Sequence, residues 1–181
     1  MIINRGNFGL FRRNRADSGR PVIRPEMGPA DWLLEVFAFT GMILFAGYTI
    51  YNFPHLPATI PTHFNGYGQA DEFGDKTSFL VLPGVALFVY GLLTLINLVP
   101  HTFNYTVKIT AANALRQYTM ATRLIRILKS GVIWGFLYIS FSTLQVARGV
   151  TTGMGAWFLP VFLGIVTIPI VVYVIMAARK N

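Results

Sequence analysis

Cysteine is absent from this 181-residue chain. Without a thiol the protein forms no disulfide, binds no metal through thiolate and uses no cysteine nucleophile. Cysteine usage therefore says nothing about the redox compartment. The N-terminus also lacks the short apolar region and small-residue cleavage site of a secretory signal, so we expect the first hydrophobic span to remain as an anchor.

Charged residues are scarce, at 12% of the chain, whereas hydrophobic residues make up 54%. This composition excludes an ordinary soluble domain, which carries about 25% charged residues. A hydrocarbon core roughly 30 Å thick needs about 20 apolar residues in a helix. Four stretches reach that length, so residues 31–178 are expected to form an all-α integral membrane domain, a four-transmembrane-helix bundle. The predicted spans are residues 32–53, 78–99, 128–147 and 156–178.

Acidic residues are fewer than basic residues, and the basic residues are unevenly placed. Six precede the first span, five lie between the second span and the first turn of the third, and two follow the fourth. Only Lys76 and Arg148 lie in the other two connections. By the positive-inside rule we expect both termini in the cytoplasm of a bacterial inner membrane. Orientation and anionic lipid account for the net charge of +8, so nucleic acid is not an expected partner.

Residues 1–30 form a basic arm that is rich in Arg, Asn, Gly and Pro. Its apolar content is confined largely to "FGLF", residues 8–11. Such a stretch cannot bury enough apolar surface to fold alone. We expect a cytoplasmic docking element that contacts membrane lipids or a partner protein through Arg12, Arg13 and Arg15.

The connection between the second and third spans has no proline or glycine after Pro100, which predicts a helix that runs into the third span. On a helical wheel its basic residues gather on one side. We expect Arg116, Arg123 and Arg126 to contact lipid headgroups, with a partner-protein surface as the alternative. Further along, Gly131 and Gly135 have a spacing that allows close helix approach, either within the chain or between copies.

Two acids begin the first span. Asp31 is expected to be the N-cap, and Glu35 to complement the helix dipole in the first turn. A proton-relay role for Glu35 is the alternative, because ionisable residues inside spans are often functional.

The connection between the first two spans reads "LPATIPTHFNGYGQADEFGDK", residues 56–76. Its segment "TIPTHFN" predicts a short extended stretch, while "NGYGQ" and "EFGDK" predict turns. We expect a compact extracytoplasmic loop that caps the first two spans. Phe64 is expected to lie buried beneath this loop, and Asp71 to pair with Lys76.

Specific catalytic and metal motifs are not found in this loop. Gly66 and Gly68 lack the third glycine of a nucleotide fingerprint. His55 and His63, with their neighbouring acids, lack the usual spacing of zinc ligands. A serine, histidine and acid set for nucleophilic catalysis is also not recognisable. We therefore expect no cofactor and no metal.

The loop resembles the motif of domain of unknown function 1648, a small bacterial membrane domain that also precedes the SdpI domain in SdpI-type immunity proteins. The motif runs Leu-Pro, Ile-Pro-x-His-Phe-Asn, Gly, an acid, Gly and Lys, followed at once by a span. Its residues here are Leu56, Pro57, Ile60, Pro61, His63, Phe64, Asn65, Gly68, Asp71, Gly74 and Lys76. The resemblance implies a bacterial inner-membrane protein without known catalysis.

These features predict a non-enzymatic membrane protein that acts through protein and lipid contacts, as an accessory or structural subunit of a larger membrane complex. An SdpI-like immunity or sensor protein is the alternative. A small transporter or membrane enzyme is the second alternative, and it would depend on Glu35, His63 or Asn97.

Overall fold

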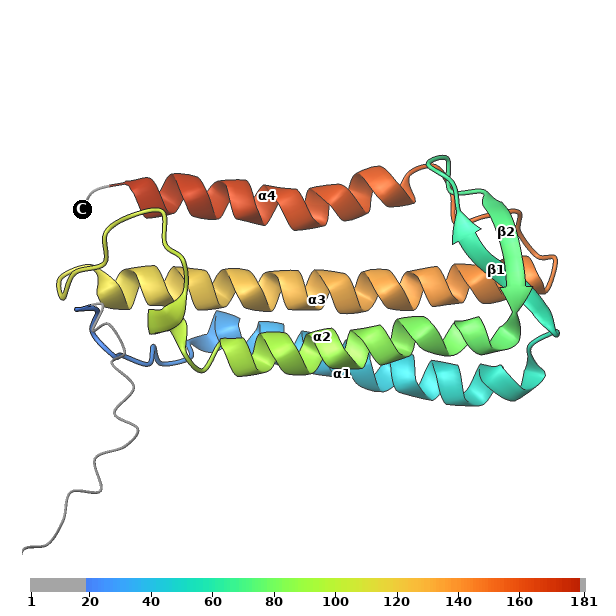
Figure 1. Cartoon of the computed structure of the whole chain (residues 1–181), viewed down its shortest axis with the longest axis horizontal. Coiled ribbons are helices and arrows are strands. Elements are labelled where there is room, and N and C mark those ends of the chain that lie inside the picture. Colours follow the sequence, from blue (N-terminus) through green and yellow to red (C-terminus); the bar gives the residue numbers. More distant parts are fainter. Residues whose placement is uncertain (1–18, 180–181) are drawn as a thin grey trace, which may run out of the picture.

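The computed structural model describes residues 19–179, which are mainly helical (Figure 1). Its four long helices are α1 (Pro29–Asn52), α2 (Val81–Ile96), α3 (Ala114–Ala147) and α4 (Phe158–Ala178). Together with the short 3-10 turns that adjoin α1 and α2, all four are long and apolar enough to cross a membrane. The prediction of four long apolar helices is therefore confirmed, and these helices indicate a multi-pass membrane protein.

Two strands correct the all-α expectation. β1 (Thr59–Phe64) and β2 (Ala70–Asp75) pair as an antiparallel hairpin between α1 and α2. The extended segment "TIPTHFN" is confirmed, whereas the turn predicted over "EFGDK" is wrong. Pairing with β1 satisfies the backbone groups of this polar segment, which outweighs its local turn preference. We call this end of the molecule the hairpin end, and the opposite end, where α1 begins and α4 ends, the terminal end (Figure 1).

α3 is the central helix. It packs against each of the other three, while α4 packs on α3 and makes no comparable contact with α1 or α2 among the described residues (Figure 1). The apolar core between α1, α2 and α3 is formed by Phe45, Ala86 and Ile133. α3 buries many polar side chains, whereas most of the apolar surface of α4 is exposed. This distribution suits a bilayer, because lipid accepts apolar surface and polar groups need protein partners.

α3 begins later than the sequence predicts. The helix expected from residue 100 starts at Ala114, and a 3-10 turn, Pro100–Thr102, with irregular chain occupies the preceding residues. The described part of the arm, residues 19–28, lies against this irregular segment. Arg20 Nη1 donates to the Phe103 carbonyl at 2.8 Å, and the Tyr118 hydroxyl donates to the Pro21 carbonyl at 3.0 Å. This part of the arm therefore docks on its own chain.

The glycine pair of α3 faces α4. A Cβ atom at Gly131 would lie 2.7 Å from Cγ2 of Ile165, and the Phe162 ring occupies the space beside Gly135. The two alternatives that the sequence left open are thus resolved, because these glycines allow close packing inside the chain.

Candidate functional site

Asn65 organises the turn of the hairpin. Its side-chain Oδ1 accepts from the backbone N–H of Tyr67 at 2.9 Å and of Gln69 at 3.1 Å. Its backbone N–H donates to the Gln69 carbonyl at 2.9 Å, and its carbonyl accepts from the Gly68 N–H at 2.8 Å. A short amide side chain is well suited to bond nearby backbone groups in this way. The predicted turn at "NGYGQ" is therefore confirmed.

Gly68 joins the hairpin to the connection between α3 and α4. Gly68 has a φ of 74°, and a Cβ atom there would overlap the carbonyl of Gly155. The Gly68 carbonyl accepts from the Met154 N–H at 2.8 Å, and Gln69 forms a β-bridge with Gly153. A Cβ atom at Gly153 would in turn overlap the Gly68 carbonyl. Glycine is needed here both for the positive φ and for the close backbone approach.

His63 pairs with Asp71 across the hairpin. The Nδ1 atom lies 2.6 Å from Asp71 Oδ1, and both side chains are exposed, at 58% and 41%. The hydrogen bond to Asp71, followed by its negative charge, raises the pKa of His63 above the ordinary value of 6.5. Asp71 was expected to pair with Lys76, and this expectation is wrong. The Lys76 ammonium lies instead 5.5 Å from the centre of the Phe53 ring.

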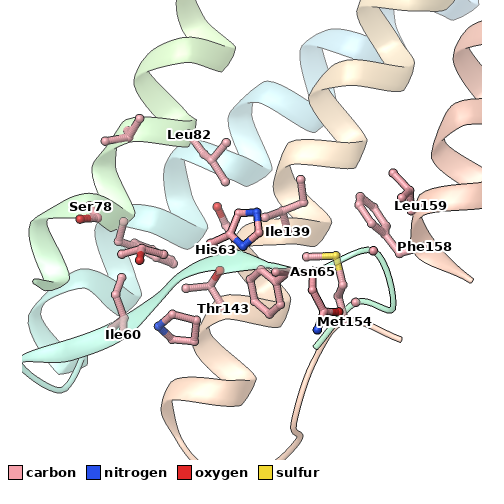
Figure 2. A pocket seen from close by; sticks show the side chains of 18 residues that line it. Ile60, His63, Asn65, Ser78, Leu82, Ile139, Thr143, Met154, Phe158 and Leu159 are labelled. Atoms are coloured by element: carbon pink, nitrogen blue, oxygen red, sulfur yellow. The ribbon is translucent and has the colours of Figure 1, made fainter. Parts of the chain in front are cut away.

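A pocket of about 480 Å³ lies beneath β1. Figure 2 shows Leu82 of α2, Thr143 of α3 and Phe158 of α4 around this space, with His63 and Asn65 on the hairpin side. Its lining is mainly apolar. A concave, mainly apolar space with a few polar groups is the usual form of a ligand site.

Phe64 lines this pocket but is only half-buried, so its expected burial beneath the loop is confirmed only in part. Ile60, at 1% exposure, is the residue that anchors the hairpin. It packs in a cluster with Leu56, Phe79 and Leu144. The register shifts on either side of His63 interrupt the alternation of side chains along β1, so consecutive residues beyond Ile60 also line the pocket. The loop thus covers α3 as well as the first two spans.

The other motif residues shape the hairpin. Pro57 is exposed before β1, and Pro61 is buried within β1 opposite Phe73. Gly74 faces Ile60, and a Cβ atom there would lie 2.9 Å from Cγ2 of Thr62. Asp75 Oδ1 accepts from the Thr77 N–H at 2.8 Å, and this hydrogen bond lowers the pKa of Asp75.

A second polar cluster lies near the terminal end, between α1 and α3. Asp31 receives two hydrogen bonds from Arg123, from Nε at 3.0 Å and from Nη2 at 2.9 Å. Its Oδ2 also accepts from the Gly28 N–H at 3.1 Å. Gly28 is the N-cap, so the N-cap role predicted for Asp31 is wrong. The helix starts earlier because Pro29 has the backbone angle that the first helical position requires.

Glu35 is held by both of its oxygens. Arg126 Nε donates to Oε1 at 3.1 Å, and Lys129 Nζ donates to Oε2 at 2.6 Å. Lys129 is fully buried, donates also to Thr94 Oγ1 at 3.0 Å, and lies 4.8 Å from the centre of the Tyr90 ring. The cluster therefore ties α1, α2 and α3 together.

The basic residues expected at the membrane surface have different surroundings. Arg126 is directed inward, with its side chain only 10% exposed, while Arg123 keeps 43% exposure. Arg116 donates to the carbonyls of Met176 and Arg179 at the end of α4. A cation at this position complements the helix dipole. Arg12, Arg13 and Arg15 lie outside the described residues.

Within residues 19–179, the structure brings no group of three metal-binding side chains together. Of the residues that a transporter or enzyme would require, Glu35 is fully paired and His63 is exposed. Asn97 Nδ2 donates to the Thr122 carbonyl at 3.3 Å, and its Oδ1 is buried with no partner in the described chain.

Three features of these sites are not among the predictions from the sequence. The first is the pairing of the acids of α1 with the bases of α3, although acids inside a span need partners. The second is the contact of Gly68 with "TGMG", residues 152–155, although paired glycines often mark close backbone approach. The third is Ser140, for which the sequence carries no distinguishing pattern.

Comparison with known proteins supports the resemblance at the hairpin. The family described as "Domain of unknown function (DUF1648)" matches residues 40–87, about a quarter of the chain. The matched segment runs from the second half of α1 through the hairpin into α2. An uncharacterized protein from Archaeoglobus fulgidus is 42% identical over 38 residues, which cover 21% of this chain and 21% of that protein. No solved structure matches.

Proposed function

We propose that this chain is a non-enzymatic accessory subunit of a larger complex in the bacterial inner membrane, with both termini in the cytoplasm. One observation carries the proposal. The hairpin exposes two large aromatic side chains, Tyr67 at 77% and Phe73 at 59%. The hairpin lies beyond the first residues of α2 and α4, so these rings belong to the face outside the hydrocarbon core. Aromatic residues are enriched where proteins bind one another.

Rigidity at the hairpin end supports this role. The Gly68 contact with residues 153–155 and the burial of Ile60 fix the hairpin on α3. A surface that is ordered before it binds loses less entropy when a partner docks. Pairing of Glu35 with Arg126 and Lys129 further supports a contact role, since both acceptor oxygens of this acid are occupied.

Purification from the native membrane in mild detergent tests the proposal. The wild-type protein should co-purify with a larger complex in stoichiometric amounts. The variant Tyr67→Ser with Phe73→Ser should lose the complex while keeping the wild-type Tm. Phe88→Leu is the matched control, because Phe88 is an exposed aromatic residue within α2. A wild-type protein that purifies alone, or a double variant that retains the complex, would contradict the accessory role.

A ligand sensor is the second candidate function, and the pocket beneath β1 favours it. β1 of the hairpin lines the pocket, so we expect a bound ligand to shift the hairpin and with it Tyr67 and Phe73. A sensor should purify without a stoichiometric complex, and ligand should change the reactivity of a cysteine placed at Gln69. Unchanged reactivity with a filled pocket would exclude this coupling.

A further inference from the structure

The pocket beneath β1 is lined by residues of both α2 and α4. Val81 of α2 and Leu159 of α4 line it and are 60% and 42% exposed. These two helices make no substantial contact with each other among the described residues. Because both helices are long and apolar enough to cross a membrane, we expect the gap between them to face lipid. An apolar chain can therefore enter from the side without crossing water.

Ser140 supplies an unsatisfied donor in this pocket. It is 1% exposed, lines the pocket, and its Oγ has no hydrogen-bond partner in the described chain. Serine in a helix often donates to the carbonyl four residues earlier, as Ser130 does to Arg126 at 2.9 Å. A buried hydroxyl without a partner is costly, and an acceptor atom on a ligand would remove that cost.

The scarcity of charged side chains in the pocket restricts the charge that a ligand can carry. Apart from His63, the residues that line the pocket carry no ionisable side chain. The cations near the hairpin end are engaged elsewhere: Lys76 lies over Phe53, and Arg148 donates to Asn52 Oδ1 at 3.2 Å. An anionic group inside the pocket would be buried without a counterion, which is costly. The buried part of the ligand is therefore neutral.

We propose that this pocket binds an ester-linked acyl chain of a membrane lipid, whose carbonyl oxygen accepts a hydrogen bond from Ser140. The volume of about 480 Å³ falls within the range of roughly 300–1,000 Å³ that ligand pockets occupy. The ester carbonyl matches the unpartnered buried hydroxyl of Ser140, and the acyl chain matches the apolar walls. This site goes beyond the accessory role, because it lies under the hairpin and not on its outer face.

Native mass spectrometry of the delipidated full-length protein tests the inference. Dioleoylglycerol and dioleoylphosphatidylglycerol serve as separate probes, because they share the acyl ester and differ in the headgroup. We expect saturable binding of one lipid per chain. Binding of both probes identifies the acyl ester as the recognised group, and binding of the phospholipid alone identifies a membrane phospholipid as the source.

Three variants locate the site. Ser140→Ala should weaken lipid binding roughly fivefold, the loss expected for one hydrogen bond. Ser142→Ala is the matched control, because Ser142 is a buried serine of α3 that does not line the pocket. Leu82→Trp should abolish binding by filling the pocket. Absence of saturable wild-type binding, or unchanged binding in Ser140→Ala, would overturn the inference, as would an equal loss in Ser142→Ala. None of these outcomes depends on the complex tested above.

Discussion

At Gly68 the chain turns with a φ of 74°, and the Gly155 carbonyl lies against the space that a side chain would occupy. A residue with a Cβ atom would be strained there in two ways, through its backbone angle and through the overlap. At Ser140, by contrast, the side chain itself is the unusual feature, because its hydroxyl is buried without a partner in the described chain. Single positions thus set the shape of the hairpin end and the chemistry of its pocket.

Gly68→Ala should lower the free energy of unfolding by roughly 1–3 kcal/mol, because a non-glycine residue is strained at this φ and its Cβ atom displaces residue 155. Thermal unfolding in detergent measures the effect. Gly66→Ala is the matched control, since nothing lies within 4 Å of a Cβ atom there. Equal Tm values for the two variants would show that the contact with Gly155 does not hold the hairpin.

The His63–Asp71 pair should make stability depend on pH. Since the pKa of His63 is raised above 6.5 in the folded protein, the contribution is fully present below about pH 6.5 and is lost as the pH rises through the raised value. The Tm difference between wild type and Asp71→Asn should therefore shrink as the pH rises. Glu72→Gln leaves the hydrogen bond intact and should keep most of the pH dependence. A difference that grows with pH would refute the pairing.

At the scale of elements, the polarity of a helix matches its place in the bundle. α3 carries the buried Gln117, Thr122 and Lys129 and lies at the centre, whereas α4 is apolar and peripheral. In water the most apolar helix would be the most buried, but in lipid only polar groups must find protein partners. The cluster around Glu35 is the strongest case, because it joins α1, α2 and α3 through charged side chains.

Glu35→Met should destabilise the protein by about 3–5 kcal/mol, because it leaves the buried Lys129 ammonium without its carboxylate. Adding Lys129→Met should restore much of the loss, since the buried ammonium is then gone and Arg126 keeps Asp31 Oδ1 as a partner at 3.5 Å. The Tm values of the single and double variants in detergent provide the comparison. Glu26→Gln, at an exposed residue of the arm, controls for the loss of an acid. A double variant less stable than Glu35→Met would show that Lys129 has another charge partner.

At the scale of the whole molecule, the described basic residues gather at the terminal end, and only Lys76 and Arg148 lie at the hairpin end. Some of this charge is neutralised, because Arg123, Arg126 and Lys129 pair with Asp31 and Glu35. An excess of positive charge at the terminal end remains, because the basic residues of the arm and Lys108 are not part of these pairs. This excess supports an outward-facing hairpin.

Cysteine labelling in intact cells measures this orientation, and the cysteine-free chain gives no background. Gln69→Cys at the hairpin end should react with an impermeant reagent, whereas Thr106→Cys at the terminal end should react only after the membrane is opened. Both positions are exposed. Labelling of Thr106→Cys alone would show that the topology is inverted.

The sequence by itself determined the four long apolar helices, the extended segment "TIPTHFN", the turn at Asn65 and the resemblance of the loop. These features depend on the length of apolar stretches, on local backbone preference and on short-range side-chain hydrogen bonds. All three are determined by residues that are close together in the sequence. Prediction from the sequence failed for the turn at "EFGDK", because pairing with β1 outweighed the local turn preference. It also failed for the degree of burial of Phe64 and for the residue at which α3 begins.

Only the tertiary structure decided which distant residues meet. Asp31 binds Arg123 across 92 positions of sequence, Gly68 meets Gly155, and Ser140 reaches a pocket built by β1, α2 and α4. Each of these contacts depends on how α1, α2 and α4 pack on α3. Hydropathy cannot supply that arrangement, because it reports how readily a helix enters lipid and not which face it turns toward its neighbours.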